Sequence, residues 1–267
     1  TEYSASIFET QKCEFQANSN STSYRLIVHT SSTSALAYSL RFAQISVSPG
    51  TSSTGSQKVP TVQRFTSGSG TYTTPSGAKW LRVRVVGGGE GGGGGGTGGS
   101  TAGTAGGNST FGSSLLTANG GSGYAGGTAT VSSPATTIVA VTGGSGGGRF
   151  INNGLTTVAA DGGPGGTNPM GGAGQSIAQS SATAGAANTG AGGGGGTGGS
   201  SGLTYAGIGG GAGGYLEAII SPVAATYAYS VGSGGAGGSG SVSTGGTGGS
   251  GYIEVTEFYY NAVPSNE

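Results

Sequence analysis

The residue types that usually carry chemistry are few in this sequence and widely spaced. Its one histidine, His29, lies in the run RLIVHTSS with no cysteine or carboxylate at metal-ligand spacing. Glycoside hydrolysis needs two placed carboxylates, and Glu90, Asp161 and Glu217 are too scattered to argue as a pair. GxGxxG patterns occur without the strand, acidic residue and helix of a dinucleotide-binding fold. We therefore expect no catalytic residue, no metal site and no cofactor, and we predict that the protein is not an enzyme.

Charge and hydropathy exclude further classes of protein. Nine basic and nine acidic residues leave no net charge, which argues against an electrostatic binder of nucleic acid or of a membrane surface. No apolar run of about 18 residues is present, so we expect no membrane insertion. The single cysteine, Cys13, can form no disulfide within the chain, and its strand-like context favours a small buried side chain.

Glycine sets the main question, because 65 of the 267 residues are glycine and almost all lie between Gly87 and Gly251. So much glycine usually indicates disorder, since each glycine loses the most backbone entropy on folding and buries no side chain. Disordered segments normally carry high net charge. Here Arg149 and Asp161 are the only charged side chains between Gly91 and Leu216, and this neutrality favours an ordered domain.

Strand-like sequence lies on both sides of the glycine region and supports the same interpretation. In residues 79–86, Leu81, Val83 and Val85 alternate with a second set of residues at the period of two that is typical of a strand. Three further strands are predicted at 215–220, 226–231 and 251–260. The tyrosines of these C-terminal segments are expected to pack within this framework: Tyr215, Tyr227, Tyr229, Tyr252, Tyr259 and Tyr260.

The conformation of the glycine runs follows from what glycine disfavours. Helix costs about 1 kcal/mol per glycine relative to alanine, ordinary strands gain no side-chain packing, and collagen needs an unbroken triplet register with abundant proline. The remaining solution is a left-handed threefold helix of the polyglycine II type, hydrogen-bonded directly to neighbouring helices. A G-G-x triplet would then point one side chain in three outward. Rods are expected near 87–107, 120–127, 143–148, 162–174, 190–199, 207–214 and 232–251, and the nonapeptide GGGGGTGGS occurs in two of them, at 92–100 and 192–200.

The segments between the rods are the candidate recognition loops, because loops on a rigid scaffold usually carry binding residues. Aromatic side chains and arginine dominate binding hot spots. For each candidate the alternative is that its side chain plugs the end of a rod, and the run TTIVAV (136–141) is expected in the core. The segments are 108–119, 128–142, 149–161, 167–170, 175–188 and 200–208. The candidate receptor-binding residues are Phe111, Leu115, Tyr124, Arg149, Phe150, Asn152, Met170 and Tyr205.

Two motifs carry a family resemblance. The opening RFTSGSGTYTTPSGAKWLRVRVVGGGEGGGGG (64–95) and the closing YSVGSGGAGGSGSVSTGGTGGSGYIEVTEF (229–258) resemble the glycine-rich domain at the tips of bacteriophage tail fibres. The match runs from Arg64 to Phe258. It implies a sandwich of packed polyglycine II helices whose variable loops bind the host receptor. The loops here resemble no particular loop set, so the resemblance does not identify the receptor.

The N-terminal residues form a separate part. The segment ALAYSLRFAQISVSPG (35–50) resembles the last strands of jelly-roll, carbohydrate-binding modules of phage and bacterial fibres, and we expect the chain to be a piece of a longer fibre. The expected fold is all-β plus polyglycine II. Its parts are a jelly-roll-like fragment at 1–50, a linker at 51–62, a β-framed bundle of packed polyglycine II helices at 63–260 and a tail at 261–267.

The predicted function is that of a receptor-binding adhesin at the distal tip of a homotrimeric fibre. The expected partner is a bacterial cell-surface receptor, either a glycan or an outer-membrane protein, and the expected location is extracellular, on a phage tail fibre. A surface fibre of a bacterium that binds another cell is a second possibility. A structural or ice-binding polyglycine protein is a third, for which Thr97, Thr197 and Thr247 would have to form exposed rows.

Overall fold

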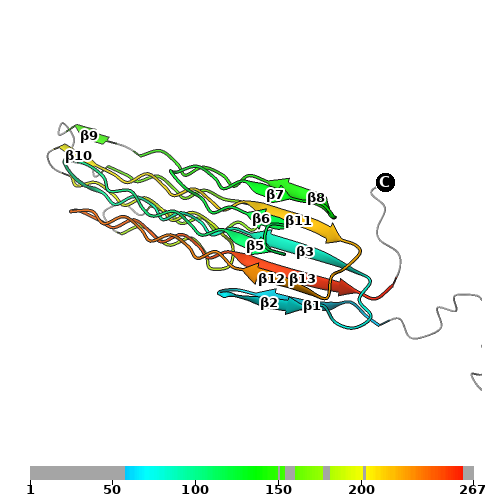
Figure 1. Cartoon of the computed structure of the whole chain (residues 1–267). Helices are drawn as coiled ribbons and strands as arrows, with labels where there is room; N and C mark the ends of the chain where they lie inside the picture. The colour runs from blue at the N-terminus through cyan, green and yellow to red at the C-terminus, as the bar shows by residue number, and fades with distance from the viewer. Residues whose placement is uncertain (1–57, 150, 154–159, 177–180, 201–202, 261–267) are drawn as a thin grey trace, which may run out of the picture. The chain divides into compact units, whose positions relative to one another are not determined.

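The computed structural model describes residues 58–149, 151–153, 160–176, 181–200 and 203–260 (Figure 1). By its internal contacts the chain divides into two units, Thr1–Gln57 and Lys58–Glu267. The first unit lies wholly outside the described residues. The jelly-roll-like module expected at 1–50 and the tail expected at 261–267 therefore stay predictions.

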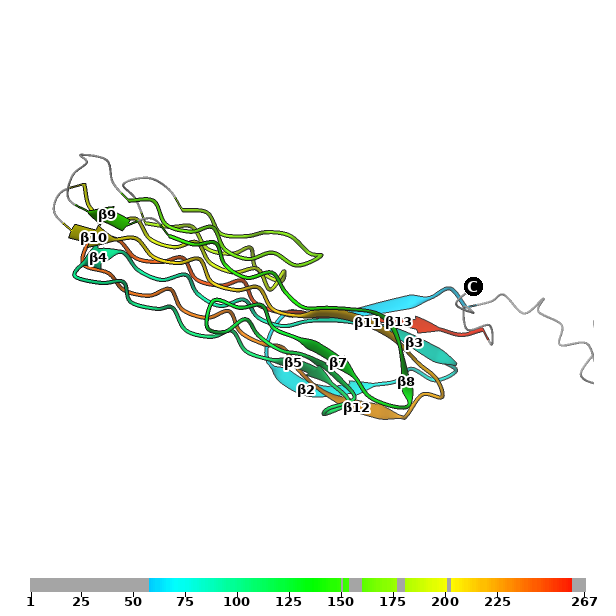
Figure 2. The ribbon, with the colours of Figure 1, turned by 90° about the horizontal axis from the view of Figure 1, so that it is seen from above.

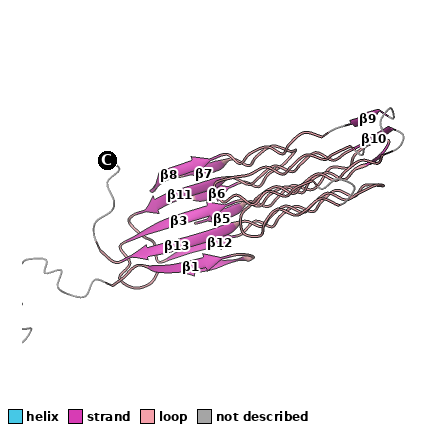
Figure 3. Cartoon of the chain, turned by 180° about the vertical axis from the view of Figure 1, so that it is seen from behind, coloured by secondary structure: helices cyan, strands magenta, loops and turns pink. Residues whose placement is uncertain are grey.

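The described residues are all-β, with antiparallel sheets and no helix, which confirms the β part of the expected fold class (Figure 3). Two five-stranded sheets lie at one end of the second unit. The first has the order β1 (Thr61–Phe65), β13 (Tyr252–Phe258), β3 (Trp80–Val86), β11 (Tyr215–Ile220) and β8 (Ala135–Val141). The second has the order β2 (Ser69–Thr73), β12 (Thr226–Ser230), β5 (Ser109–Phe111), β6 (Leu116–Ala118) and β7 (Ala129–Val131).

The two sheets pack against each other because each has one apolar face. In β3, Leu81, Val83 and Val85 are buried in the core, whereas Arg82 and Arg84 are accessible on the opposite face, as the alternation of residues 79–86 predicts. Burying one such aliphatic side chain contributes about 1.5–3 kcal/mol. The rest of the core comes from Leu216, Ala218, Ile220, Ile253 and Val255 of the first sheet and from Tyr72, Phe111, Leu116 and Tyr227 of the second.

The four strands predicted around the glycine region are confirmed, with bounds that differ by no more than two residues. They are β3, β11, β12 and β13. The packing expected of the tyrosines is confirmed for Tyr215 and Tyr227, which are buried, and for Tyr229, which packs against the core.

The glycine-rich segments are direct continuations of the strands. Residues 87–96 follow β3, 206–214 lead into β11 and 243–251 lead into β13. They run side by side away from the two sheets, and Figures 1 and 2 show this from two directions. We call this part the glycine bundle; it comprises residues 87–107, 119–128, 142–149, 160–176, 181–200, 206–214 and 231–251.

Residues 87–96 show how the segments of the glycine bundle are joined, because their N–H groups follow a three-residue repeat. The N–H groups of residues 87, 90 and 93 donate to carbonyl groups of the segment 206–214, at 2.8–2.9 Å. Those of residues 88, 91 and 94 donate to 101–107 at 2.8–3.0 Å, and those of 89, 92 and 95 donate to 243–251 at 2.9 Å. One segment is thus bonded to three neighbours in turn. A β-strand has neighbours on only two sides, so the bundle is an array in three dimensions and not a sheet.

The segments approach so closely that many interior positions have no room for a side chain. A Cβ atom built on Gly92 would lie 2.0 Å from the carbonyl oxygen of Gly194, and one built on Gly89 would lie 2.0 Å from that of Ala191. These distances are far inside van der Waals contact. Glycine is therefore required at these positions by the approach of the neighbouring backbone.

The outer segments bury their residues with a period of three. In residues 161–167 the four glycines are buried, whereas Asp161, Pro164 and Thr167 are exposed. In residues 244–249, Thr244 and Thr247 are exposed, and the second glycine of each following pair is buried. This agrees with the expectation that one side chain in three points outward.

Three expectations about the intervening segments are wrong. Segments 108–119 and 128–142 are not loops between rods, because they form β5, β6, β7 and β8 of the two sheets. Residues 120–127 are not one rod, because the chain folds back at Gly123 and Tyr124, whose φ angles are 61° and 66°. The run 136–141 lies in β8 at the edge of the first sheet, and its Ile138 is exposed, not in the core.

Candidate functional site

A small third sheet lies at the end of the glycine bundle that is far from the two large sheets (Figures 1 and 2). It has the order β4 (Gly96–Thr97), β10 (Leu203–Tyr205) and β9 (Ile151–Asn153), and both pairs are antiparallel. Thr204 pairs with Thr97 on one side and with Asn152 on the other. Most residues of these three strands have a side chain, and they pair as an ordinary antiparallel β-ladder in place of the close-packed glycine array. We call this sheet and the turns beside it the tip.

Arg149 and Tyr205 form the most distinctive contact of the tip. The guanidinium carbon of Arg149 lies 5.7 Å from the centre of the Tyr205 ring, within the range of a cation–π contact. The Nη1 group of Arg149 also donates a hydrogen bond to the hydroxyl oxygen of Ser100. The ring and the hydroxyl together hold the guanidinium at the end of the bundle.

Two aliphatic side chains of the tip are exposed to solvent. Leu203 has 51 % of its surface exposed, and Val242, in the neighbouring turn, has 43 %. The buried Thr204 donates its hydroxyl hydrogen to the carbonyl oxygen of Gly199, at 2.7 Å. Thr97 is exposed, and its N–H donates to the hydroxyl oxygen of Ser241 at 3.1 Å. The tip therefore offers a cation, an aromatic ring, hydroxyl groups and exposed aliphatic surface.

The tip brings together three of the eight candidate residues. Arg149 and Tyr205 are in contact, and Asn152 lies on β9 opposite Thr204 of β10. Phe150 lies outside the described residues, so its place stays a prediction. Val242 was missed by sequence reasoning, although it is the one bulky aliphatic residue in the glycine run 232–251, and that isolation is the signal that could have found it.

Two candidate residues belong to the core of the large sheets and not to a recognition surface. Phe111 of β5 has no exposed surface, and its ring stacks on that of Tyr227 with centroids 4.9 Å apart. Leu115 is partly buried against the same core. The expectation that Phe111 contacts a receptor is corrected by its position, because this apolar residue of β5 is buried between the two sheets. Leu115 lies in the turn that joins β5 to β6, outside the tip sheet.

Tyr124 and Met170 are also remote from the tip sheet. Tyr124 occupies the turn at which residues 120–127 fold back. Met170 lies in a turn whose first residue, Asn168, donates its side-chain amide to the carbonyl oxygens of Thr189 and Gly213, at 2.8 and 3.0 Å. Gly213 is two residues from β11, so this turn lies near the sheets.

Glu90 is an unusual residue, since it is a buried carboxylate within a run of glycines. Its Oε2 atom accepts hydrogen bonds from the N–H groups of Tyr124, at 2.6 Å, and of Gly211, at 3.0 Å. The side chain therefore joins the turn at Tyr124 to the segment 206–214. Its role in this arrangement is structural.

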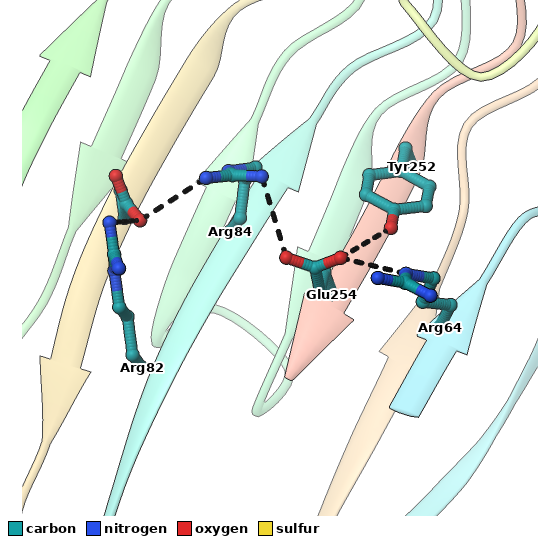
Figure 4. A network of polar contacts seen from close by, with 6 residues as sticks. Arg64, Arg82, Arg84, Tyr252 and Glu254 are labelled. Atoms are coloured by element: carbon teal, nitrogen blue, oxygen red, sulfur yellow. Dashed lines mark hydrogen bonds and ion pairs between the residues drawn. The ribbon is translucent and has the colours of Figure 1, made fainter. Parts of the chain in front are cut away.

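Among the described residues, the largest group of ion-paired charges lies on the outer face of the first sheet (Figure 4). It contains Arg64, Arg82, Arg84, Glu217 and Glu254. Arg84 bridges the two carboxylates, with 3.5 Å to Glu217 and 3.4 Å to Glu254. Arg64 lies 2.8 Å from Glu254.

The environment of Glu254 shows how its carboxylate is held within this group of ion pairs. Burial acts to raise the pKa of the Glu254 carboxyl, but hydrogen bonds from Arg64 and Tyr252 and the charge of Arg84 together hold that pKa below its ordinary value. Tyr252 donates its hydroxyl hydrogen to Glu254 at 2.8 Å. Through its ion pairs with Arg64 and Arg84, the Glu254 carboxylate links β13 to β1 and β3.

A further carboxylate, Glu257, is buried between the two large sheets. It accepts hydrogen bonds from Thr61 at 2.5 Å, from Gln63 at 2.8 Å and from Tyr72 at 3.1 Å. Burial and the neighbouring Glu257 carboxylate raise the pKa of the Tyr72 hydroxyl. This cluster joins β1, β2 and β13 across the interior.

Known proteins do not identify the tip, and the described residues contain neither a candidate metal site nor a helix that could cross a membrane. The sequence matches no known protein-family model, and no curated protein has a similar sequence. Among the described residues there is no group of three or more histidine, cysteine, aspartate or glutamate side chains that could hold a metal ion. Within that same part of the chain, no helix is long and apolar enough to cross a membrane.

Proposed function

We propose that this chain is a non-enzymatic adhesin that binds a receptor on the bacterial cell surface through the tip. The observation that carries the proposal is the contact of Arg149 with Tyr205 beside the exposed Leu203, at the far end of a bundle with few other large side chains. Arginine and tyrosine are enriched at binding hot spots. Exposed aliphatic side chains next to them add apolar surface that a partner would bury.

The glycine bundle suits the stiff stem that such an adhesin needs, and we propose that its segments are polyglycine II helices. Two features support this. The N–H groups of residues 87–96 turn to three neighbours with a repeat of three, and the outer segments bury two glycines and expose one residue in each triplet at 161–167. Three residues per turn is the geometry of the threefold helix.

The setting proposed for the adhesin is the distal end of a homotrimeric fibre on a phage tail. Support comes from the resemblance of residues 64–95 and 229–258 to tail-fibre tip domains. A bacterial surface fibre of the same design is the alternative. The molar mass of the chain in solution, measured by light scattering, tests the trimer.

The binding function is tested with variants of the tip and a matched pair of variants elsewhere. Replacing Arg149, Leu203 and Val242 together with alanine should lower binding to receptive bacterial cells at least tenfold. The control replaces Val62 and Ile138 of the large sheets, which are exposed to similar extents, 46 % and 41 %, and should leave binding unchanged. Equal binding by the tip variant and the wild type, with both folded, would refute the assignment.

The arrangement of the threonines argues against the ice-binding alternative. Thr97 and Thr247 are exposed, but Thr197 is buried. The three threonines that such a function would use therefore do not share one exposed face. A measurement of thermal hysteresis in a freezing assay distinguishes the two functions, because only an ice-binding protein produces it.

A further inference from the structure

We infer that the ligand of the tip is an acidic saccharide, whose carboxylate or phosphate group is bound by Arg149. This inference rests on the proposed adhesin function and names the chemistry of its receptor. It is carried by the charge of the tip, by the way in which Arg149 is held, and by the neutral groups around it.

Among the described residues, no carboxylate lies within 4.0 Å of the Arg149 side-chain nitrogens. The only other ionisable acidic or basic side chains among the described residues 87–214 are the buried Glu90 and the exposed Asp161. In the part of the chain that the structure describes, every ion pair within 4.0 Å lies on the first sheet, and none involves Arg149. Asp161 lies on the segment next to that of Arg149, since the N–H of Gly147 donates to the carbonyl oxygen of Pro164, but it forms no ion pair with Arg149 within 4.0 Å. A cation without such an ion pair attracts an anion from solution.

Among the described residues, the contacts of Arg149 are one hydrogen bond to Ser100 and one contact with the face of the Tyr205 ring. Arginine has five N–H donors in a planar fork, and the hydroxyl of Ser100 takes one of them. The guanidinium carbon also lies over the Tyr205 ring, 5.7 Å from its centre. A guanidinium held in this way loses less side-chain entropy when it binds, and its remaining N–H groups match the two oxygens of a carboxylate or phosphate.

The groups around Arg149 favour a sugar as the carrier of that anion. The exposed Thr97 and Ser241 supply hydroxyl groups, and Leu203 and Val242 supply exposed aliphatic surface. A sugar ring presents hydroxyl groups at its rim and C–H groups on its faces, so both kinds of surface find a partner. No second cation is present among the described residues of the tip, which fits a ligand with isolated anionic groups in a largely neutral polymer.

The first test uses three simple probes with the full chain. Glucuronate, glucose 6-phosphate and glucose are titrated separately, and the amide signals of Leu203 and Tyr205 are followed by NMR. We expect saturable binding of the two acidic sugars with a dissociation constant of about 1–10 mM, and no saturation with glucose. Arg149→Gln should weaken binding at least tenfold, as expected for a charge-assisted hydrogen bond. The control Lys79→Gln removes an exposed cation of the large sheets and should change nothing.

Several outcomes of this titration would overturn the inference. Binding of glucose as tight as that of glucuronate would remove the role of the anionic group. Inorganic phosphate that binds as tightly as glucose 6-phosphate would show a site for a bare anion, with no contribution from the sugar. Unchanged binding by Arg149→Gln would show that another residue holds the ligand.

A second test separates this inference from the proposed function. Receptive cells are treated either with periodate, which cleaves sugar rings, or with a protease, and binding of the full chain is measured. Loss with periodate and retention after protease is the expected result. Loss with protease alone would identify a protein receptor, which overturns the saccharide inference but leaves the adhesin function intact. A chain that binds no cells but still binds glucuronate through Arg149 would overturn the function and leave the anion site standing.

Discussion

The two large sheets and the glycine bundle are stabilised in opposite ways, although the same chain segments run through both. Between the sheets, side chains such as Leu81 and Phe111 fill the interior. In the bundle, the interior consists mainly of backbones, and N–H groups donate to carbonyl groups of adjacent segments at 2.7–3.2 Å. The transition falls at the end of each strand: Val86 is the last residue of β3, and Gly87 begins the bundle.

This difference shows that a sequence can specify tight packing in two ways. Large side chains can fill the interior, or glycines can let neighbouring backbones pack directly against one another. In the sheets, stability comes mainly from apolar area removed from water. In the bundle, each hydrogen bond contributes only about 0.5–1.5 kcal/mol net, and every glycine loses backbone entropy on ordering. The bundle must therefore satisfy nearly all of its backbone groups to be stable. Removing a side chain should therefore lower the free energy of unfolding of the sheets, whereas adding one should lower that of the bundle.

The largest expected effect is the loss of a core side chain. Phe111→Ala should lower the free energy of unfolding by about 3–5 kcal/mol, because it leaves a cavity between the sheets beside Tyr227. Chemical denaturation followed by the fluorescence of Trp80, the only tryptophan, measures this change. Thr110→Ala, one residue earlier and only half-buried, is the control and should cost much less. A cost below about 1 kcal/mol for Phe111→Ala would contradict the assignment of this ring to the core.

In the glycine bundle the gain of one methyl group should be harmful. Gly92→Ala puts a Cβ atom 2.0 Å from the carbonyl oxygen of Gly194, and overpacking of this kind typically costs about 1–3 kcal/mol. We expect the upper end of that range, because backbone atoms surround the site. Gly148→Ala is the matched control: its Cβ would meet no atom within 4 Å. Equal stability of the two variants would show that the segments are not packed at the distances described.

The sequence reveals much of this contrast. Apolar residues that alternate at the period of two predicted β3. The glycine runs were predicted to be ordered because they carry almost no charge and have strands on both sides. Both follow from local pattern. The strands β5 and β6 have three residues each, which is too short for a period to appear, and their place is set by pairing with distant segments. For this reason Phe111 resembled a loop aromatic in the sequence and is a core residue in the fold.

The tip could be predicted only in part for the same reason. Arg149 and Tyr205 stood out as an isolated cation and an isolated ring, but they lie far apart in the sequence, and nothing local indicates that they meet. Their contact depends on which segments of the bundle are neighbours. Val242 was overlooked because a single valine carries no periodic signal.

Glu90 sharpens the comparison, since it is one of the places where a side chain joins two segments of the bundle. Glu90→Ala removes the acceptor for the N–H groups of Tyr124 and Gly211, and an unsatisfied buried donor costs about 1–3 kcal/mol. We expect a loss of about 2 kcal/mol in the free energy of unfolding, with faster amide exchange at both residues. Glu90→Gln keeps a carbonyl oxygen in the same place and should recover most of that stability. If Gln and Ala variants were equally destabilised, the negative charge itself would be required. If neither lost stability, backbone contacts alone would hold the turn at Tyr124.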